Sequence, residues 1–188
     1  MANKKALALT KDQYEQLIDA MRTGGETFRA NSRIATALVL EANLGLRIGD
    51  ILSLRLKDIV LDGPRYRLDI IEKKTGKSRV FTVPLPIYQY LRLYCLDHGI
   101  GLDEMIFPVK ERTVQKYLAK VSAELGMEGI GTHSFRKFFA TEIYLNNNYN
   151  LLLVQKLLQH SSAAITQRYI GISSRELEDA LAAHINLK

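Results

Sequence analysis

The apolar pattern of the chain changes its period between residues 60 and 86, and this change limits the possible folds. Before and after that stretch, apolar residues recur every three to four positions, which predicts amphipathic helices. Residues 66–71 instead alternate apolar and polar side chains, and a second short run at 79–83 follows a Lys-rich turn at 73–77. This alternation predicts a β-hairpin or the core of a three-stranded sheet. The expected fold class is therefore α+β, mostly α, with a small three-stranded antiparallel sheet.

Start and stop signals divide the rest into helices. Thr10 with Gln13 is typical of a capping box, Gly24-Gly25 ends the first helix, and Gly45 is a candidate C-cap for the second. Further helices are expected near residues 31–44, 48–54, 86–98, 111–125, 134–146, 150–159, 162–169 and 173–185.

Composition narrows the class of protein but does not identify a partner. A chain of 188 residues is long enough for one domain with a real core. Its net charge of +6 is consistent with a polyanionic partner. The single cysteine, Cys95, excludes an intrachain disulfide, fits a reducing compartment and lies in an apolar stretch typical of burial. Since neither a signal peptide nor an apolar run of membrane-spanning length is found, we expect a cytoplasmic protein without a membrane partner.

Polar residues at helix boundaries in the last third carry the chemistry. His133 and Arg136 are three positions apart at a helix start, so they share one face. His160 lies at a helix end, and Tyr169 follows nine residues later. Taken singly, these residues also suit a solvated helix start, a helix C-cap and a packing tyrosine. Taken together they suit nucleophilic attack, because a phenol with a pKa near 10 needs neighbouring bases and cations to lose its proton.

Cations upstream could grip the group under attack. Arg47 follows the helix that ends at Gly45, and its planar guanidinium suits two nonbridging phosphate oxygens. The simpler alternative is an ion pair with Asp50 or Glu41. Lys74 at the hairpin tip could act as an acid on the same phosphate, although a solvated turn is the alternative there. Electrostatic attraction to the backbone of nucleic acid is the expected role of Lys73, Lys77, Arg79 and Lys137.

In this order, the residues Arg47, Lys74, His133, Arg136, His160 and Tyr169 resemble the catalytic domain of tyrosine recombinases, the phage-type integrases. Residues 46–54 resemble the family's first arginine box and residues 132–137 its second. The nine-residue step from His160 to Tyr169 also matches. The sequence departs from the family at Gly49-Asp50, where Ser-Glu is usual, and at Gln159, where Gly is usual and the turn geometry is therefore in question.

The resemblance implies a site-specific DNA recombinase or integrase. Tyr169 would attack a DNA phosphodiester to form a 3′-phosphotyrosyl link, and strands would exchange through a Holliday junction. The two arginines would stabilise the developing charge, His133 would assist proton loss, and His160 would donate to a phosphoryl oxygen. Lys74, with Lys77 as the alternative, would protonate the leaving 5′-oxygen. No metal or other cofactor is implied.

The resemblance also implies an organisation. We expect residues 1–188 to form a single catalytic domain, without the core-binding and arm-binding domains of the family; it would be an excised domain or a short stand-alone member. The expected partner is double-stranded DNA in a prokaryotic nucleoid, bound by a homotetramer that exchanges the helix at 173–185, unless that helix packs on its own domain. Accessory DNA-bending or excisionase proteins are further candidates. A non-catalytic DNA-binding regulator and a type IB topoisomerase are the alternative functions.

Overall fold

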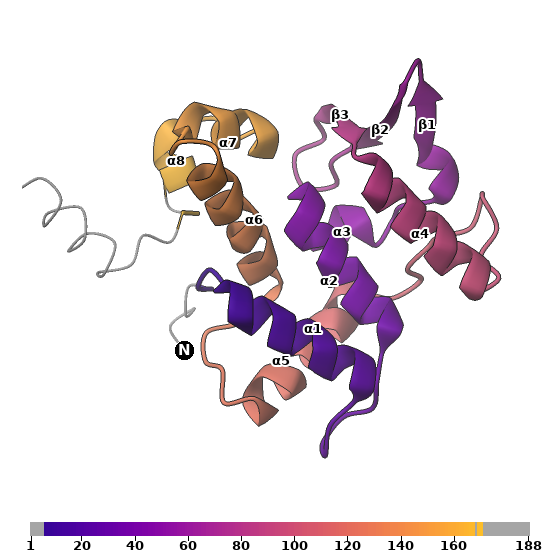
Figure 1. Cartoon of the computed structure of the whole chain (residues 1–188), viewed down its shortest axis with the longest axis vertical. Coiled ribbons are helices and arrows are strands. Elements are labelled where there is room, and N and C mark those ends of the chain that lie inside the picture. Colours follow the sequence, from indigo (N-terminus) through magenta and orange to yellow (C-terminus); the bar gives the residue numbers. More distant parts are fainter. Residues whose placement is uncertain (1–5, 168, 171–188) are drawn as a thin grey trace, which may run out of the picture.

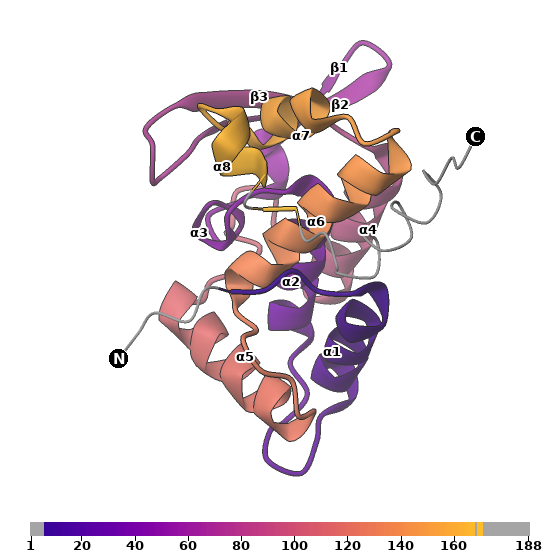
Figure 2. The same ribbon diagram turned by 90° about the vertical axis from the view of Figure 1, so that its left-hand side faces the viewer.

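The computed structural model describes residues 6–167 and 169–170 (Figures 1 and 2). Helices precede and follow a small sheet, as the change of period predicted. In chain order the elements are α1 (Lys11–Thr23), α2 (Ser32–Leu44), α3 (Ile48–Ile51), the 3-10 helix η1 (Leu56–Asp58), β1 (Ile59–Asp62), β2 (Arg65–Ile71), β3 (Ser78–Val83), α4 (Leu85–Asp97), α5 (Glu111–Glu124), α6 (Thr132–Asn146), α7 (Leu151–Leu158) and α8 (Ala163–Gln167).

The sheet is three-stranded and antiparallel in the order β1-β2-β3, which confirms the predicted fold class. Its register pairs Leu68 with Phe81 and Ile70 with Arg79. Side chains on opposite strands at paired positions share one face of a sheet. The face that carries Leu68 is therefore also the face of Arg79.

The core is built around α2, which packs on α1, α3 and α6 (Figure 1). The predicted caps explain its limits: Thr10 and Gln13 form the capping box of α1, and Gly45 ends α2 in the left-handed conformation. A smaller apolar cluster joins α6 to α7 through residues such as Phe139 and Leu158. Cys95 is buried, as predicted.

Some boundaries differ from the prediction. The helix expected at 48–54 ends at Ile51, because the Ser53 hydroxyl donates to the Asp50 carbonyl and competes with the helical pattern. The helix expected at 162–169 is described from Ala163 to Gln167, so Tyr169 follows it in a turn. The helix expected at 173–185 lies outside the described residues. No helix in the described part of the chain is long and apolar enough to cross a membrane.

Candidate active site

The turn after α2 brings the two arginine boxes together. Gly45 has a φ of 59°, and a Cβ at this position would overlap the ring of Phe139, so only glycine fits without displacement. Its carbonyl accepts a hydrogen bond from Arg136 on α6. Arg47 follows as the N-cap residue of α3. The tight turn therefore places Arg47 close to the start of α6.

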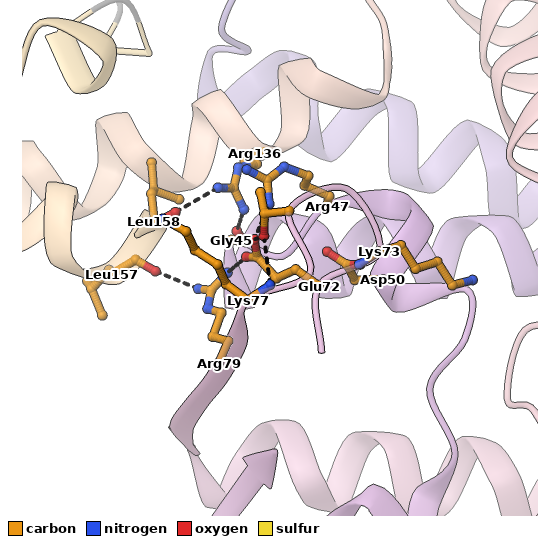
Figure 3. A network of polar contacts seen from close by, with 11 residues as sticks. Gly45, Arg47, Asp50, Glu72, Lys73, Lys77, Arg79, Arg136, Leu157 and Leu158 are labelled. Atoms are coloured by element: carbon orange, nitrogen blue, oxygen red, sulfur yellow. Dashed lines mark hydrogen bonds and ion pairs between the residues drawn. The ribbon is translucent and has the colours of Figure 1, made fainter. Parts of the chain in front are cut away.

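Arg47 has an acidic partner that the sequence analysis did not predict. Its Nη1 donates to Oε2 of Glu72 at 2.5 Å (Figure 3). Asp50 and Glu41, the partners in the simpler alternative, do not pair with Arg47. Asp50 instead accepts the backbone N–H of Lys73 at 2.8 Å. Glu41 is fully buried, and its carboxylate makes no ion pair with Arg47.

A pattern in the sequence could have revealed Glu72. Along β2, Leu68 is buried and Ile70 is half-buried, and the next position in this alternation is Glu72, on the same face. The lysines that follow Ile71 predict only a basic turn. An acid in phase with a buried strand face indicates a buried ion pair, since an unpaired buried carboxylate is costly.

Arg136 is completely buried and holds two separate segments. It donates to the carbonyl of Gly45 and, from Nη2 at 3.0 Å, to the carbonyl of Leu158 at the end of α7. Burial, and then the charges of Arg47 and Arg79, lower the pKa of Arg136 to about 10. The guanidinium therefore remains charged at neutral pH.

His160 and Tyr169 face each other beside Arg136. The rings of His160 and Tyr169 lie 4.6 Å apart between centroids. Nδ1 of His160 is hydrogen-bonded to the hydroxyl of Thr166 at 3.1 Å, which orients the imidazole. The guanidinium carbon of Arg136 and the ammonium of Lys137 each lie 6.0 Å from the centre of the Tyr169 ring. The phenol is thus surrounded by cations and an imidazole.

The other predicted residues line a cleft of about 340 Å³. Its lining includes Arg47, Lys74 and His133, together with Asp50 and Lys73. Burial, then Arg136 and Lys74, lower the pKa of His133, so the imidazole favours its neutral form. Lys77 is not part of this lining. Between the two lysines left open by the sequence, the cleft contains Lys74.

The remaining cations differ in exposure. Lys73 and Lys77 are exposed, and Lys137 donates to the backbone carbonyl of Ala6. Arg79 is 3% exposed, so it does not occupy the surface position that its expected role in DNA binding requires. It lies in phase with Phe81 on the inner face of β3, where its guanidinium stacks 4.9 Å from that ring. Within the described residues, no three His, Cys, Asp or Glu side chains gather as metal ligands.

The pKa of His160 predicts how stability responds to acid. Burial, then Arg136 and Arg47, lower this pKa from 6.5 to about 4. As the pH falls, His160 therefore binds a proton near pH 6.5 in the unfolded chain but only near pH 4 in the folded chain. Because the unfolded state binds more protons between these two values, the free energy of unfolding should fall as the pH drops through this window. Urea denaturation at several pH values should show a shallower fall in His160→Gln. The comparison is needed because buried Glu41, whose pKa is raised, contributes the opposite slope. Equal slopes in the two proteins would contradict the prediction.

The turn geometry at Gln159, where the family usually has glycine, is left-handed. Gln159 ends α7 with φ 53° and ψ 39°, so it adopts the left-handed turn for which glycine is favoured. Gln159→Gly is expected to raise the free energy of unfolding by about 0.5–1 kcal/mol, because the left-handed strain exceeds the entropy that glycine loses. The matched control is Gln115→Gly inside α5, which should lower it by about 1 kcal/mol. A loss of stability in Gln159→Gly would refute the interpretation.

The chain is similar in sequence to known proteins. The sequence profile of the phage integrase family matches residues 8–176. The chain belongs to this family. It is 32% identical over 149 residues to the probable integrase/recombinase YoeC of Bacillus subtilis (strain 168), covering 76% of this chain and 79% of YoeC. It is 34% identical to the tyrosine recombinase XerC of Methylobacterium sp. (strain 4-46), covering 81% of this chain but only 50% of that protein. The chain thus spans about half the length of the XerC relatives that it matches.

Solved structures of the family share the fold. The XerH site-specific recombinase, in a post-cleavage complex with a palindromic difH substrate, superposes with a TM-score of 0.73 at 20% identity over 97% of this chain and 54% of that chain. A lambda integrase dimer bound to a COC′ core site gives a TM-score of 0.70 at 20% identity, covering 98% of this chain and 52% of that chain. The catalytic domain of bacteriophage HP1 integrase gives 0.64 at 18% identity, with 96% of each chain covered. At these identities the likeness establishes the fold.

Proposed function

We propose that this chain cleaves and rejoins DNA as the catalytic domain of a site-specific tyrosine recombinase, with double-stranded DNA as its substrate. The observation that carries the proposal is the convergence of six residues from separate elements around one region. Arg47, Lys74 and His133 line one cleft. The rings of His160 and Tyr169 lie 4.6 Å apart between centroids, and the guanidinium carbon of Arg136 lies 6.0 Å from the centre of the Tyr169 ring. Burial, and then the charge of Arg136, lower the pKa of both histidines, so Arg136 acts electrostatically on both groups of residues.

In the proposed reaction, the hydroxyl oxygen of Tyr169 attacks the scissile phosphorus. A tyrosyl O–P bond forms and the bond to the 5′-oxygen breaks, leaving a 3′-phosphotyrosyl link and a free 5′-hydroxyl. Neutral His133 assists the loss of the phenol proton, and Lys74 supplies a proton to the leaving 5′-oxygen. A 5′-hydroxyl from a second strand reverses the attack, so the phosphodiester energy is conserved and strands exchange through a Holliday junction.

Electrostatics supply the remaining stabilisation. Arg47 and Arg136 would face the nonbridging oxygens, where negative charge develops in the transition state. His160 would donate a hydrogen bond to the same phosphoryl group. Because Arg136 is fully buried in this conformation, its contact with a phosphate requires a local rearrangement around its guanidinium. We propose that this rearrangement accompanies the assembly of several protomers on DNA, and that the assembly is a homotetramer.

Covalent trapping tests this function. The full chain is incubated with end-labelled, nicked duplexes sheared from the DNA around its gene, so that cleavage near a nick releases a short 5′-hydroxyl fragment and prevents rejoining. The mixture is boiled in detergent, and protein-linked DNA is recovered and sequenced. We expect a slowly migrating adduct that survives boiling, together with a defined cleavage site.

Other outcomes would favour other functions. DNA binding that is lost in detergent, with no adduct on any duplex, would favour a non-catalytic DNA-binding regulator. Relaxation of a supercoiled plasmid without paired sites would favour a type IB topoisomerase activity.

A further inference from the structure

One buried carboxylate lies at the centre of the polar network. Glu72, immediately after β2, is 2% exposed, and its two oxygens have different partners (Figure 3). Oε2 accepts from Nη1 of Arg47 at 2.5 Å and from the Thr75 hydroxyl at 2.8 Å. Oε1 accepts from Nη1 of Arg79 at 3.4 Å. The carboxylate therefore bridges the first arginine, the lysine turn and β3.

Arg79 extends this network to the end of α7. Its Nη2 donates to the carbonyl of Leu157 at 2.5 Å, while Arg136 donates to the next carbonyl, that of Leu158 (Figure 3). Carbonyls in the last turn of a helix lack helical partners and carry partial negative charge, so guanidinium donors suit them. His160 follows two residues after Leu158. Hydrogen bonds through Arg79 therefore connect Glu72 to the end of α7, which precedes His160 and Tyr169 in the chain.

The charge balance explains why Glu72 tolerates burial. Burial by itself raises the pKa of a carboxyl group, but the hydrogen bond from Thr75 and the hydrogen bond and charge of Arg47 outweigh it and lower the pKa of Glu72. The group is therefore ionised at neutral pH. A paired and hydrogen-bonded buried carboxylate holds its partners in one geometry, whereas an unpaired one would be strongly unfavourable.

The geometry also leaves Arg47 available for a ligand. Its side chain is 18% exposed and lines the cleft with Lys74 and His133, while Nη1 is engaged by Glu72. A free arginine side chain loses rotamer entropy when it is fixed in one conformation. Because Glu72 fixes Arg47 before a phosphate binds, this side-chain entropy is lost on folding and not during catalysis.

We propose that Glu72 is a positioning residue, which sets Arg47 against the scissile phosphate and ties the lysine turn, through Arg79, to the end of α7. This inference rests on the proposed function, since it requires a phosphate between these groups. It assigns Glu72 an indirect role, through the residues that it holds.

The decisive variant is Glu72→Gln in the full chain, assayed on a duplex that the wild-type protein cleaves. The amide keeps the size of the side chain but cannot accept from both guanidiniums. We expect single-turnover cleavage to fall about 10- to 100-fold, because small misplacement of a charged donor has effects of this order. DNA affinity should stay unchanged or rise up to about threefold, because a negative charge beside the phosphate is removed.

Two comparison variants separate geometry from charge. Asp62→Asn makes the same charge change on the same sheet, at an exposed carboxylate paired with Arg67, and should leave the cleavage rate unchanged. Glu72→Asp keeps the charge but shortens the side chain by one methylene, so it should also slow cleavage. It also tests the proposal if Glu72→Gln fails to fold.

Three results would overturn the inference. Cleavage within about twofold of wild type in the Glu72 variants that fold would remove the positioning role, with the proposed function intact. Parallel losses of DNA affinity, folding stability and cleavage would indicate a purely structural carboxylate. Absence of an adduct with the wild-type chain on every duplex would instead reject the proposed function, and this inference with it.

Discussion

Replacing Tyr169 with phenylalanine is expected to abolish the covalent protein–DNA adduct completely. Phenylalanine keeps the ring that lies 4.6 Å from His160, but it lacks the oxygen that would form the bond to phosphorus. Among the described residues, none is recorded as a hydrogen-bond partner of the Tyr169 hydroxyl. The free energy of unfolding should therefore change by less than about 0.5 kcal/mol. DNA affinity should also be retained, because the cations around the ring are untouched. Detergent-resistant adducts and band shifts would be measured in parallel.

The control for this variant is Tyr149→Phe. Tyr149 is 65% exposed and belongs to the turn between α6 and α7, so it tests whether loss of a different tyrosine hydroxyl affects adduct formation. We expect normal adduct yield from Tyr149→Phe. An adduct that persists in Tyr169→Phe would mean that another side chain is the nucleophile, and the assignment from the spacing to His160 would be rejected.

Replacing Arg136 with lysine is expected to reduce both activity and stability. A lysine ammonium is a point charge that cannot span the carbonyls of Gly45 and Leu158 as the guanidinium does. Loss of one charged hydrogen bond should lower the free energy of unfolding by about 1.5–3 kcal/mol. Loss of one preorganised donor at the phosphate should lower the cleavage rate by about 100- to 1000-fold.

The two effects of Arg136→Lys are separated by temperature and by a control. Cleavage is assayed well below the midpoint of thermal unfolding, so that the variant is folded. Arg22→Lys serves as the control, because Arg22 is exposed and makes one hydrogen bond, to the hydroxyl of Tyr90. It should alter neither quantity appreciably. A cleavage rate for Arg136→Lys within about threefold of wild type would show that a guanidinium is not required at this position.

The limits of most elements follow from local signals. Thr10 caps α1, Gly45 ends α2, and the alternating residues at 66–71 and 79–83 became paired strands, all near the predicted positions. These signals work because helical and strand hydrogen bonding, and the φ preference of glycine, depend on residues a few positions apart. The ordered motif that resembles the recombinases was equally readable, since the family is confirmed by its sequence profile.

The partners of the charged residues were decided by tertiary structure. Asp50 is close to Arg47 in sequence, yet Glu72, 25 positions away, is the acid that pairs with it. Arg79 was expected at the surface, yet it lies inside and reaches the carbonyl of Leu157, 78 positions away. Alternation along β2 and β3 placed both side chains on the inner face, but it did not show which element covers that face.

Local patterns therefore predicted most of the elements, the fold class and the six residues of the recombinase-like motif, but not Glu72. The packing of distant segments determines which charges meet, which guanidinium is buried, and how the end of α7 is held against the sheet. Burial and charge pairing depend on distances between segments that loop closure brings together, and a pattern of neighbouring residues carries no measure of those distances.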